Sequence, residues 1–182
     1  PVVGYNFVYM DALGSYYGMS GDKTVLPALL RGSLYHANFT YPNGTAVETV
    51  DERQIYHETV VFPNVGFTFS PEGRGYLKSQ TERLMAEGKK LNYDGMASIL
   101  YYGEEGDWLP TPGEKASHHF VLGDNDAVIH REGPWFVPLS SYHTAVPASR
   151  WIQDRQNFIS LFHDKTGLIL GGGNTKLQPL WS

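Results

Sequence analysis

Three absences limit what this sequence can encode. Its 182 residues include no cysteine, which excludes disulfide bonds and thiolate metal sites. Its net charge is −5 and no lysine or arginine residues cluster, so a nucleic-acid interface, which needs grouped cations, is not expected. It has no apolar run approaching the roughly 18 residues that a helix needs to cross a bilayer, so no membrane span is predicted.

The composition that remains is typical of a folded protein. Hydrophobic residues make up 41% of the chain and charged residues 18%, a balance that favours a globular domain over disorder. Aromatic residues reach 14%, and tyrosine and tryptophan offer flat amphipathic faces that suit sugar rings as well as cores. Natural chain ends are usually polar, whereas residues 2–17 are already dense in aromatics. We therefore expect this sequence to be a piece of a larger protein, and a trimmed or processed chain is the alternative.

Helical periodicity dominates the first part of the sequence. Apolar residues recur every three or four positions in residues 5–17 and again in residues 25–37. Between them, Asp22 is a candidate N-cap, so the two segments are predicted to form an antiparallel helical hairpin. A further helix is expected to begin at Ser70, with proline and glutamate next, and to end at Gly88.

The period changes to two after Gly88, which indicates strands. Turn-forming clusters separate six short candidate strands, at residues 96–102, 118–122, 127–131, 135–139, 157–163 and 168–170. Short strands at this spacing favour an antiparallel sandwich. We therefore predict an α+β fold with a helical domain at residues 1–92, including a long loop at 38–65, and a β domain at residues 93–182.

The loop at residues 38–65 holds the densest group of chemically useful side chains. Those singled out are Tyr41, Asn43, Arg53, Tyr56, His57 and Glu58. Abstraction of a proton beside a carboxylate needs donors that neutralise the carboxylate, which Asn, Arg or neutral His can supply. It also needs a base and an acid, roles that Tyr and His commonly fill. The alternative is structural, with Asn43-Gly44 as a simple turn, Tyr56 packed, and His57 and Glu58 in solvent.

Two weaker groups lie in the β half. Histidine side chains occur at positions that strands could bring together: His118, His119, His130, His143 and His163. They could hold a structural zinc or calcium ion, but their spacing matches no compact metal motif, and satisfied or exposed histidines are the main expectation. Arg150 could grip a carboxylate while Trp151 stacks on a sugar, or the arginine could pair with Asp154 in a buried salt bridge.

These features together resemble one family. The helical hairpin, the Tyr41-Pro42-Asn43-Gly44 turn, the loop with Asp51-Glu52-Arg53 and Tyr56-His57, the last helix and the strands after it resemble the heparinase II/III-like polysaccharide lyases. The segment at residues 150–181 also looks like part of such proteins. The resemblance implies the C-terminal helices of an incomplete (α/α) toroid followed by an antiparallel β-sandwich, with the substrate cleft between them.

The resemblance also implies a reaction, β-elimination in a uronic-acid-containing polysaccharide. Tyr56 or Tyr41 would then act as base or acid with His57 as partner, and Asn43 or Arg53 would neutralise the carboxylate. Glu58, Arg150 and Trp151 would contact an acidic polysaccharide or oligosaccharide. No cofactor is expected beyond a structural metal, the remainder of the same polypeptide would complete the cleft, and the location would be periplasmic or secreted.

Two other classes of function remain open at this stage. One is a carbohydrate-binding or scaffold protein that keeps the fold without the chemistry. The other is a glycoside hydrolase on a related toroid, which needs two carboxylates roughly 5–10 Å apart. Candidates for that pair are Glu48, Asp51, Glu52 and Glu58.

Overall fold

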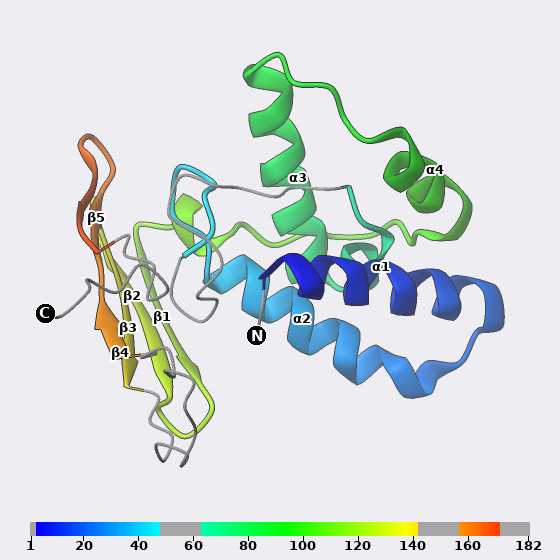
Figure 1. Ribbon diagram of the computed structural model, residues 1–182, viewed down its shortest axis with the longest axis horizontal. Helices are drawn as coiled ribbons and strands as arrows, with labels where there is room; N and C mark the ends of the chain where they lie inside the picture. The colour runs from blue at the N-terminus through cyan, green and yellow to red at the C-terminus, as the bar shows by residue number, and fades with distance from the viewer. Residues whose placement is uncertain (1–2, 48–62, 142–156, 172–182) are drawn as a thin grey trace, which may run out of the picture.

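The computed structural model describes residues 3–47, 63–141 and 157–171. These residues form an α+β fold with four α-helices and a six-stranded antiparallel sheet (Figure 1). The helices are α1 (Val3–Ser20), α2 (Leu26–Asn38), α3 (Pro71–Ala86) and α4 (Tyr93–Tyr102). Short 3₁₀ helices are η1 (Lys23–Val25), η3 (Val65–Phe69) and η4 (Pro112–Glu114). The strands are β1 (Ser117–Leu122), β2 (Ala127–Glu132), β3 (Trp135–Ser141), β4 (Asn157–Ile159), β5 (Leu161–His163) and β6 (Gly167–Leu170).

The predicted helical hairpin is confirmed by α1 and α2. Asp22 caps the turn between them, where its side chain accepts a hydrogen bond from the Thr24 amide at 3.0 Å. On its other side, α1 crosses η3 at a point where two glycines meet. A Cβ atom on Gly14 would lie 2.6 Å from the Gly66 nitrogen, and one on Gly66 would lie 2.2 Å from the Met10 carbonyl oxygen. The backbones therefore touch at this crossing.

The third helix begins and ends as the sequence predicts. The Ser70 hydroxyl accepts a hydrogen bond from the Gly73 amide at 3.1 Å, and Pro71 occupies the first helical position. After the last turn, Gly88 adopts a φ of 68° and donates its amide to the Met85 carbonyl at 3.0 Å. A left-handed residue at this position is a common way to end a helix.

The prediction of a strand at residues 96–102 is wrong, because this segment lies in α4. The Asn92 side chain accepts a hydrogen bond from the Gly95 amide at 2.9 Å and so caps the helix. The helix also passes close to Pro63, since a Cβ on Gly95 would lie 2.1 Å from the Pro63 carbonyl oxygen. The change from helix to strand falls between Tyr102 and Ser117, later than the predicted change near residues 88–95.

The other predicted strands are confirmed and belong to one sheet. Its order is β1-β2-β3-β5-β6, with β4 also paired to β3, and every pairing is antiparallel. Along β2, buried and more exposed residues alternate, which is the pattern of a sheet with one face against a core. The predicted segment 157–163 divides into β4 and β5 around the buried Ser160. The toroid and the sandwich remain predictions.

One hydrophobic core joins the helices to the sheet. Tyr41, which follows α2, stacks on Phe162 of β5 with ring centroids 5.1 Å apart. Phe39 meets Phe120 of β1 edge to face at 6.2 Å. Figure 1 shows the C-terminal end of α2 directed toward the sheet, at the place where these contacts form. The helical part and the sheet therefore fold against each other.

A buried histidine lies within the helical side of this core. The His36 ring packs against Phe7, Phe67 and Tyr76, with centroids 4.7 to 5.8 Å away. Its Nε2 atom has no hydrogen-bond partner among the described residues. Because burial penalises the charged imidazolium, the pKa of His36 falls to about 3. His36 is therefore a neutral core residue at physiological pH.

Candidate functional site

A polar contact lies where α2 meets β1, and we call it the junction pair. Asn38, at the end of α2, and His118, in β1, approach with 2.7 Å between Oδ1 and Nε2. The Asn38 amide nitrogen donates to the Leu34 carbonyl at 2.8 Å. The two residues are 80 positions apart in sequence, so only the packing of the sheet on the helices brings them together.

The second hydrogen bond of Asn38 determines which nitrogen of His118 carries the proton. Because the Asn38 nitrogen is directed to Leu34, its oxygen is the atom that faces the histidine. An amide oxygen only accepts hydrogen bonds, so Nε2 of His118 must be the donor. In the neutral ring the proton therefore resides on Nε2, and Nδ1 keeps a lone pair that can accept a proton.

The surroundings of His118 favour the neutral form. Partial burial lowers the pKa of His118 most, and the positive charges of Lys115 and His119 lower it further. His118 alternates along β1 with His119, whose side chain is exposed on the opposite face of the strand. The junction pair thus holds a neutral, oriented and only partly buried imidazole, which is the form that a general base requires.

Two predicted site residues lie beside the junction pair. Tyr41 is only 1% exposed, and its ring is part of the core. The Asn43 oxygen accepts hydrogen bonds from the amide and hydroxyl of Thr45, at 3.1 and 2.7 Å, and Gly44 adopts a φ of 84°. These contacts match the turn that was the structural alternative for Asn43-Gly44, while a catalytic role for either residue stays a prediction.

The other predicted site residues lie outside the described part of the chain. They are Arg53, Tyr56, His57, Glu58, Arg150 and Trp151. The described residue before the first of these segments is Val47, which is buried and donates its amide to the Phe39 carbonyl at 2.9 Å. The chain is described again from Pro63, next to Asn64, whose side-chain nitrogen donates to the Phe7 carbonyl at 2.6 Å. The described residues on either side of this segment therefore contact the end of α2 and the start of α1.

The other described histidines of the strands do not gather into a metal centre. His119 and His130 face each other across β1 and β2 with ring centroids 5.8 Å apart, and His163 packs against Trp135. Within residues 3–47, 63–141 and 157–171, no group of three His, Asp or Glu side chains has a geometry that could hold an ion. His143 lies outside these ranges. A structural zinc or calcium ion stays a prediction.

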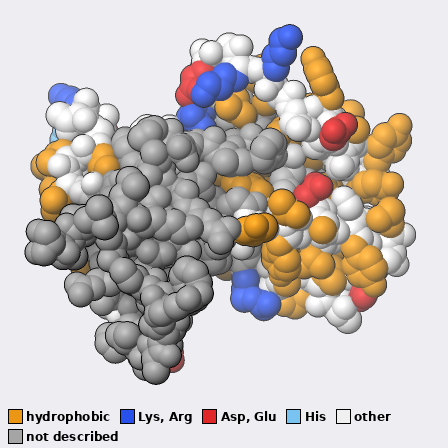
Figure 2. Space-filling model, in the orientation of Figure 1, with side chains coloured by type: hydrophobic (Ala, Val, Ile, Leu, Met, Phe, Trp, Pro, Cys, Tyr) orange, Lys and Arg blue, Asp and Glu red, His pale blue; other side chains and the backbone are white. Residues whose placement is uncertain are grey.

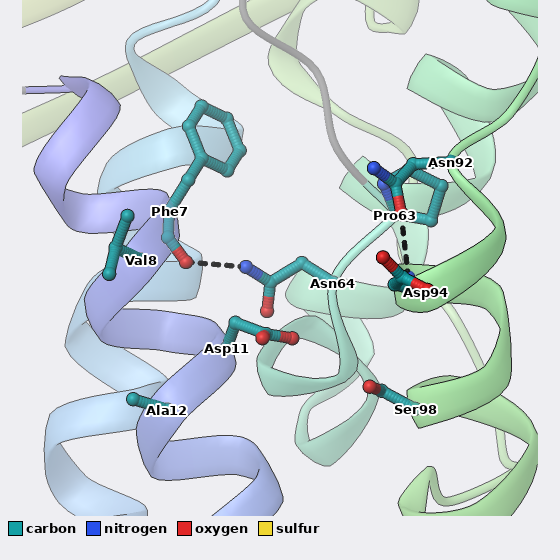
Figure 3. Close-up of a pocket in the computed structure, with 10 residues that line it drawn as sticks. Phe7, Val8, Asp11, Ala12, Pro63, Asn64, Asn92, Asp94 and Ser98 are labelled. Carbon is teal, nitrogen blue, oxygen red and sulfur yellow. Dashed lines mark hydrogen bonds between the residues drawn. The ribbon is translucent and has the colours of Figure 1, made fainter.

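A second feature is a pocket of about 370 Å³ between α1 and α4 (Figure 3). Asn64 lies at its centre, with Asp11 on the α1 side and Ser98 on the α4 side. One carboxylate oxygen of Asp11, Oδ1, is buried without a hydrogen-bond partner in the described residues. Burial raises the pKa of Asp11, and a backbone hydrogen bond from Val65 partly opposes that effect.

Comparison with known proteins assigns no family to this chain, so the proposed function depends on the geometry of the structure. No protein-family model matches the sequence, and no curated protein or solved structure matches it either. Across the described residues, none of the helices combines the length and apolar character required to cross a bilayer.

Sequence reasoning missed the most informative residues of both features. Asn38 falls at the start of the loop predicted for residues 38–65, although an asparagine in the last turn of a helix is a weak sign of a polar contact beyond it. Asp11 is the only acidic residue in the α1 sequence, and that isolation was an available signal. Neither signal identifies the partner, because His118 and α4 approach only in the folded chain.

Proposed function

We propose that this protein is a polysaccharide lyase-like enzyme that cleaves a uronic-acid-containing polysaccharide by β-elimination. The observation that carries the proposal is the junction pair, in which Asn38 orients the neutral imidazole of His118 at 2.7 Å. This imidazole lies where the helical part meets the sheet, and the sequence also contains segment 48–62, which lies outside the described residues. That segment holds the Tyr56 and His57 side chains suggested by the family resemblance.

The chemistry requires a proton to leave the carbon next to the uronate carboxylate. As this C–H bond breaks, a carbon–carbon double bond forms and the glycosidic C–O bond on the neighbouring carbon breaks. The released oxygen then takes up a proton. Nδ1 of His118 is suited to accept the first proton, because the hydrogen bond of Nε2 to Asn38 leaves that lone pair available. Tyr56, with His57, is proposed as the acid that protonates the leaving oxygen.

Neutralising the carboxylate stabilises the charge that develops during proton removal. Asn43 and Arg53 are the proposed donors, and Arg150 and Trp151 are proposed to contact the sugar chain. The chemistry of this set needs a donor for the carboxylate in addition to a base. For that reason the substrate class is an acidic polysaccharide or oligosaccharide and not a neutral glycan.

The test uses the absorbance of the unsaturated uronate that β-elimination leaves at the new chain end. The full chain is incubated with a panel of acidic polysaccharides, and absorbance near the ultraviolet edge is followed together with the release of reducing ends. We expect both signals to rise together. Reducing ends without absorbance would reject elimination in favour of hydrolysis, and binding without either signal would reject catalysis.

Matched variants distinguish the base from its neighbours. His118→Gln is expected to lower the rate about 100-fold or more, the usual scale for a general acid or base. His119→Gln, on the exposed side of the same strand, is the control and should retain the native rate. Tyr56→Phe and His57→Ala should each lose a similar factor with unchanged circular dichroism. Equal rates in the His118 and His119 variants would remove His118 from the mechanism.

A further inference from the structure

Lys115 lies next to the junction pair in sequence, just before β1. It follows the 3₁₀ helix η4 and donates its amide to the Pro112 carbonyl at 3.2 Å. The turn is capped at Thr111, whose amide and hydroxyl donate to Oε2 of Glu114 at 2.7 and 2.8 Å. The chain then bends at Lys115 and Ala116 before β1 begins. Local hydrogen bonds therefore fix the backbone of Lys115 where it leaves η4.

A buried arginine holds Lys115 from the side of the sheet. Arg131 of β2 is the register partner of His118, so their side chains are neighbours on the same face of the sheet. Nε of Arg131 donates to the Lys115 carbonyl, and its two terminal nitrogens bind the Asp164 carboxylate at 3.0 and 2.8 Å. Arg131 is only 6% exposed. One rigid side chain thus connects the backbone of Lys115 to the strand position opposite His118.

The ammonium of Lys115 acts on the junction pair. After partial burial, its positive charge is the next cause that lowers the pKa of His118. The guanidinium of Arg131 contributes less free charge to the region, because it is bound bidentately by Asp164. A neutral imidazole beside a partly buried ammonium is suited to receive an anion.

The geometry of a uronic acid fits this arrangement. Its carboxylate carbon is bonded directly to the carbon that loses the proton in β-elimination. A charged hydrogen bond of about 2.8 Å at one end and a reactive contact of about 3–3.5 Å at the other place ammonium and base within about 8 Å of each other. Lys115 precedes His118 by three residues, at most about 11 Å of extended backbone, and the bend shortens that span. The flexible stem of lysine covers the difference.

Recognition by a single lysine agrees with the distribution of charge. On the face drawn in Figure 2, the lysine and arginine side chains of the described residues occur in separate places and form no continuous basic surface. The whole chain has a net charge of −5. A polyanion therefore meets no broad basic surface on this face, and its binding depends on individual cations at the site.

We propose that the ammonium of Lys115 binds the uronate carboxylate at the junction, and so selects acidic sugars and places their C–H bond at His118. This inference rests on the proposed lyase function and adds a specificity residue to it. Lys115 supplies a carboxylate donor from the described part of the chain, alongside Asn43 and Arg53. As the proton leaves, the ammonium stabilises the negative charge that spreads onto the carboxylate.

The experiment follows the His118 imidazole of the full chain by nuclear magnetic resonance, with its signal assigned from the loss of that signal in His118→Gln. Sodium glucuronate and sodium galacturonate are titrated in, with glucose and galactose as the neutral matches. The variants are Lys115→Gln, the conservative Lys115→Arg, and Lys23→Gln as the control. Lys23 is exposed and lies before α2, at the opposite end of that helix from Asn38.

We expect both uronates, and neither neutral sugar, to shift the His118 signal. Affinity for the uronates should fall about tenfold or more in Lys115→Gln, because a charged hydrogen bond is lost, and should stay within about threefold of native in Lys115→Arg and Lys23→Gln. A pH titration without sugar gives a second measurement. The pKa of His118 should rise in Lys115→Gln, since a neighbouring positive charge is removed, and should not change in Lys23→Gln.

Three results would overturn the inference: no shift of His118 with either uronate, equal uronate affinity in Lys115→Gln and the native chain, or an equal shift with the neutral sugars. The proposed function fails in a different way. Uronate binding that depends on Lys115 without any unsaturated product would reject the lyase and keep the binding site. Elimination with an unchanged kcat/KM in Lys115→Gln would reject only the role of Lys115.

Discussion

Two regions of the molecule differ in whether their polar atoms have partners and whether their apolar side chains are buried. One is the junction between α2 and β1, and the other is the pocket between α1 and α4, which we call the groove. At the junction, the Asn38 amide is used on both its nitrogen and its oxygen, and aromatic rings close the core around it. In the groove, a carboxylate oxygen of Asp11 has no donor among the described residues, and Tyr101 of α4 is exposed. The comparison teaches that the Asn38 amide is satisfied on both sides within the described residues, whereas the groove leaves one carboxylate oxygen unpaired among those residues.

The largest expected contrast concerns stability. Phe162→Ala removes a ring that is 2% exposed and stacked on Tyr41, and it should lower the free energy of unfolding by about 3–5 kcal/mol. Tyr101→Ser in the groove should change it by no more than about 0.5 kcal/mol, because that side chain is 82% exposed. Denaturant unfolding measures both values. Comparable losses in the two variants would contradict the contrast.

A second effect concerns protonation of the core beside the junction. The native pKa of His36 is about 3, while an unfolded histidine has a pKa near 6.5. Between those values the unfolded state binds the proton and the native state does not, so stability falls as the pH falls. The slope is on the order of 1 kcal/mol per pH unit between pH 6 and 4.

The test of this slope compares His36→Phe with Phe67→Leu in unfolding experiments at several pH values. His36→Phe should flatten the dependence on pH, since the titrating group is gone. Phe67→Leu changes the same aromatic cluster without removing the imidazole, and it should keep the native slope at lower overall stability. An unchanged slope in His36→Phe would show that other groups cause the acid sensitivity.

The smallest effects should differ between the junction and the groove. Asn38→Ala leaves Nε2 of the partly buried His118 without its acceptor and should cost about 1–3 kcal/mol. Asp11→Asn should cost almost nothing or stabilise the chain slightly at neutral pH, because burial raises the pKa of Asp11 and so disfavours its charged form. That advantage should shrink as acid protonates the native carboxyl. A large loss in Asp11→Asn would mean that the carboxylate is already satisfied.

Local patterns were sufficient to predict most elements of the fold. Ser70 with the following proline predicted the start of α3, and Gly88 predicted its end, because capping and left-handed backbone depend on neighbours in sequence. The strand prediction for residues 96–102 is wrong because Ile99, Tyr101 and Tyr102 favour strands by residue type. The Asn92 cap, which starts the helix, was not included in that prediction. The helix is also supported by packing against Pro63, which sequence periodicity does not reveal.

The candidate site was less accessible to prediction than the fold. Residue type drew attention to histidines in the strands, but only the structure distinguishes His118, which meets Asn38, from His119, which faces the other way. The side of a strand that meets a helix depends on register and on which face is covered. The groove could not be predicted either, because the unpaired oxygen of Asp11 is recognised only when the folded chain shows that no described residue donates to it.

The crossing of Gly14 and Gly66 has a consequence for recognising distant relatives. Since the backbones touch there, a single added methyl group at either position would push α1 away from η3. Evolution is therefore free to change the apolar residues around this crossing but not the two glycines, which must be retained together. A distant relative that keeps this close crossing is therefore expected to keep glycine at both positions, and a relative that has lost either glycine is expected to hold α1 farther from η3.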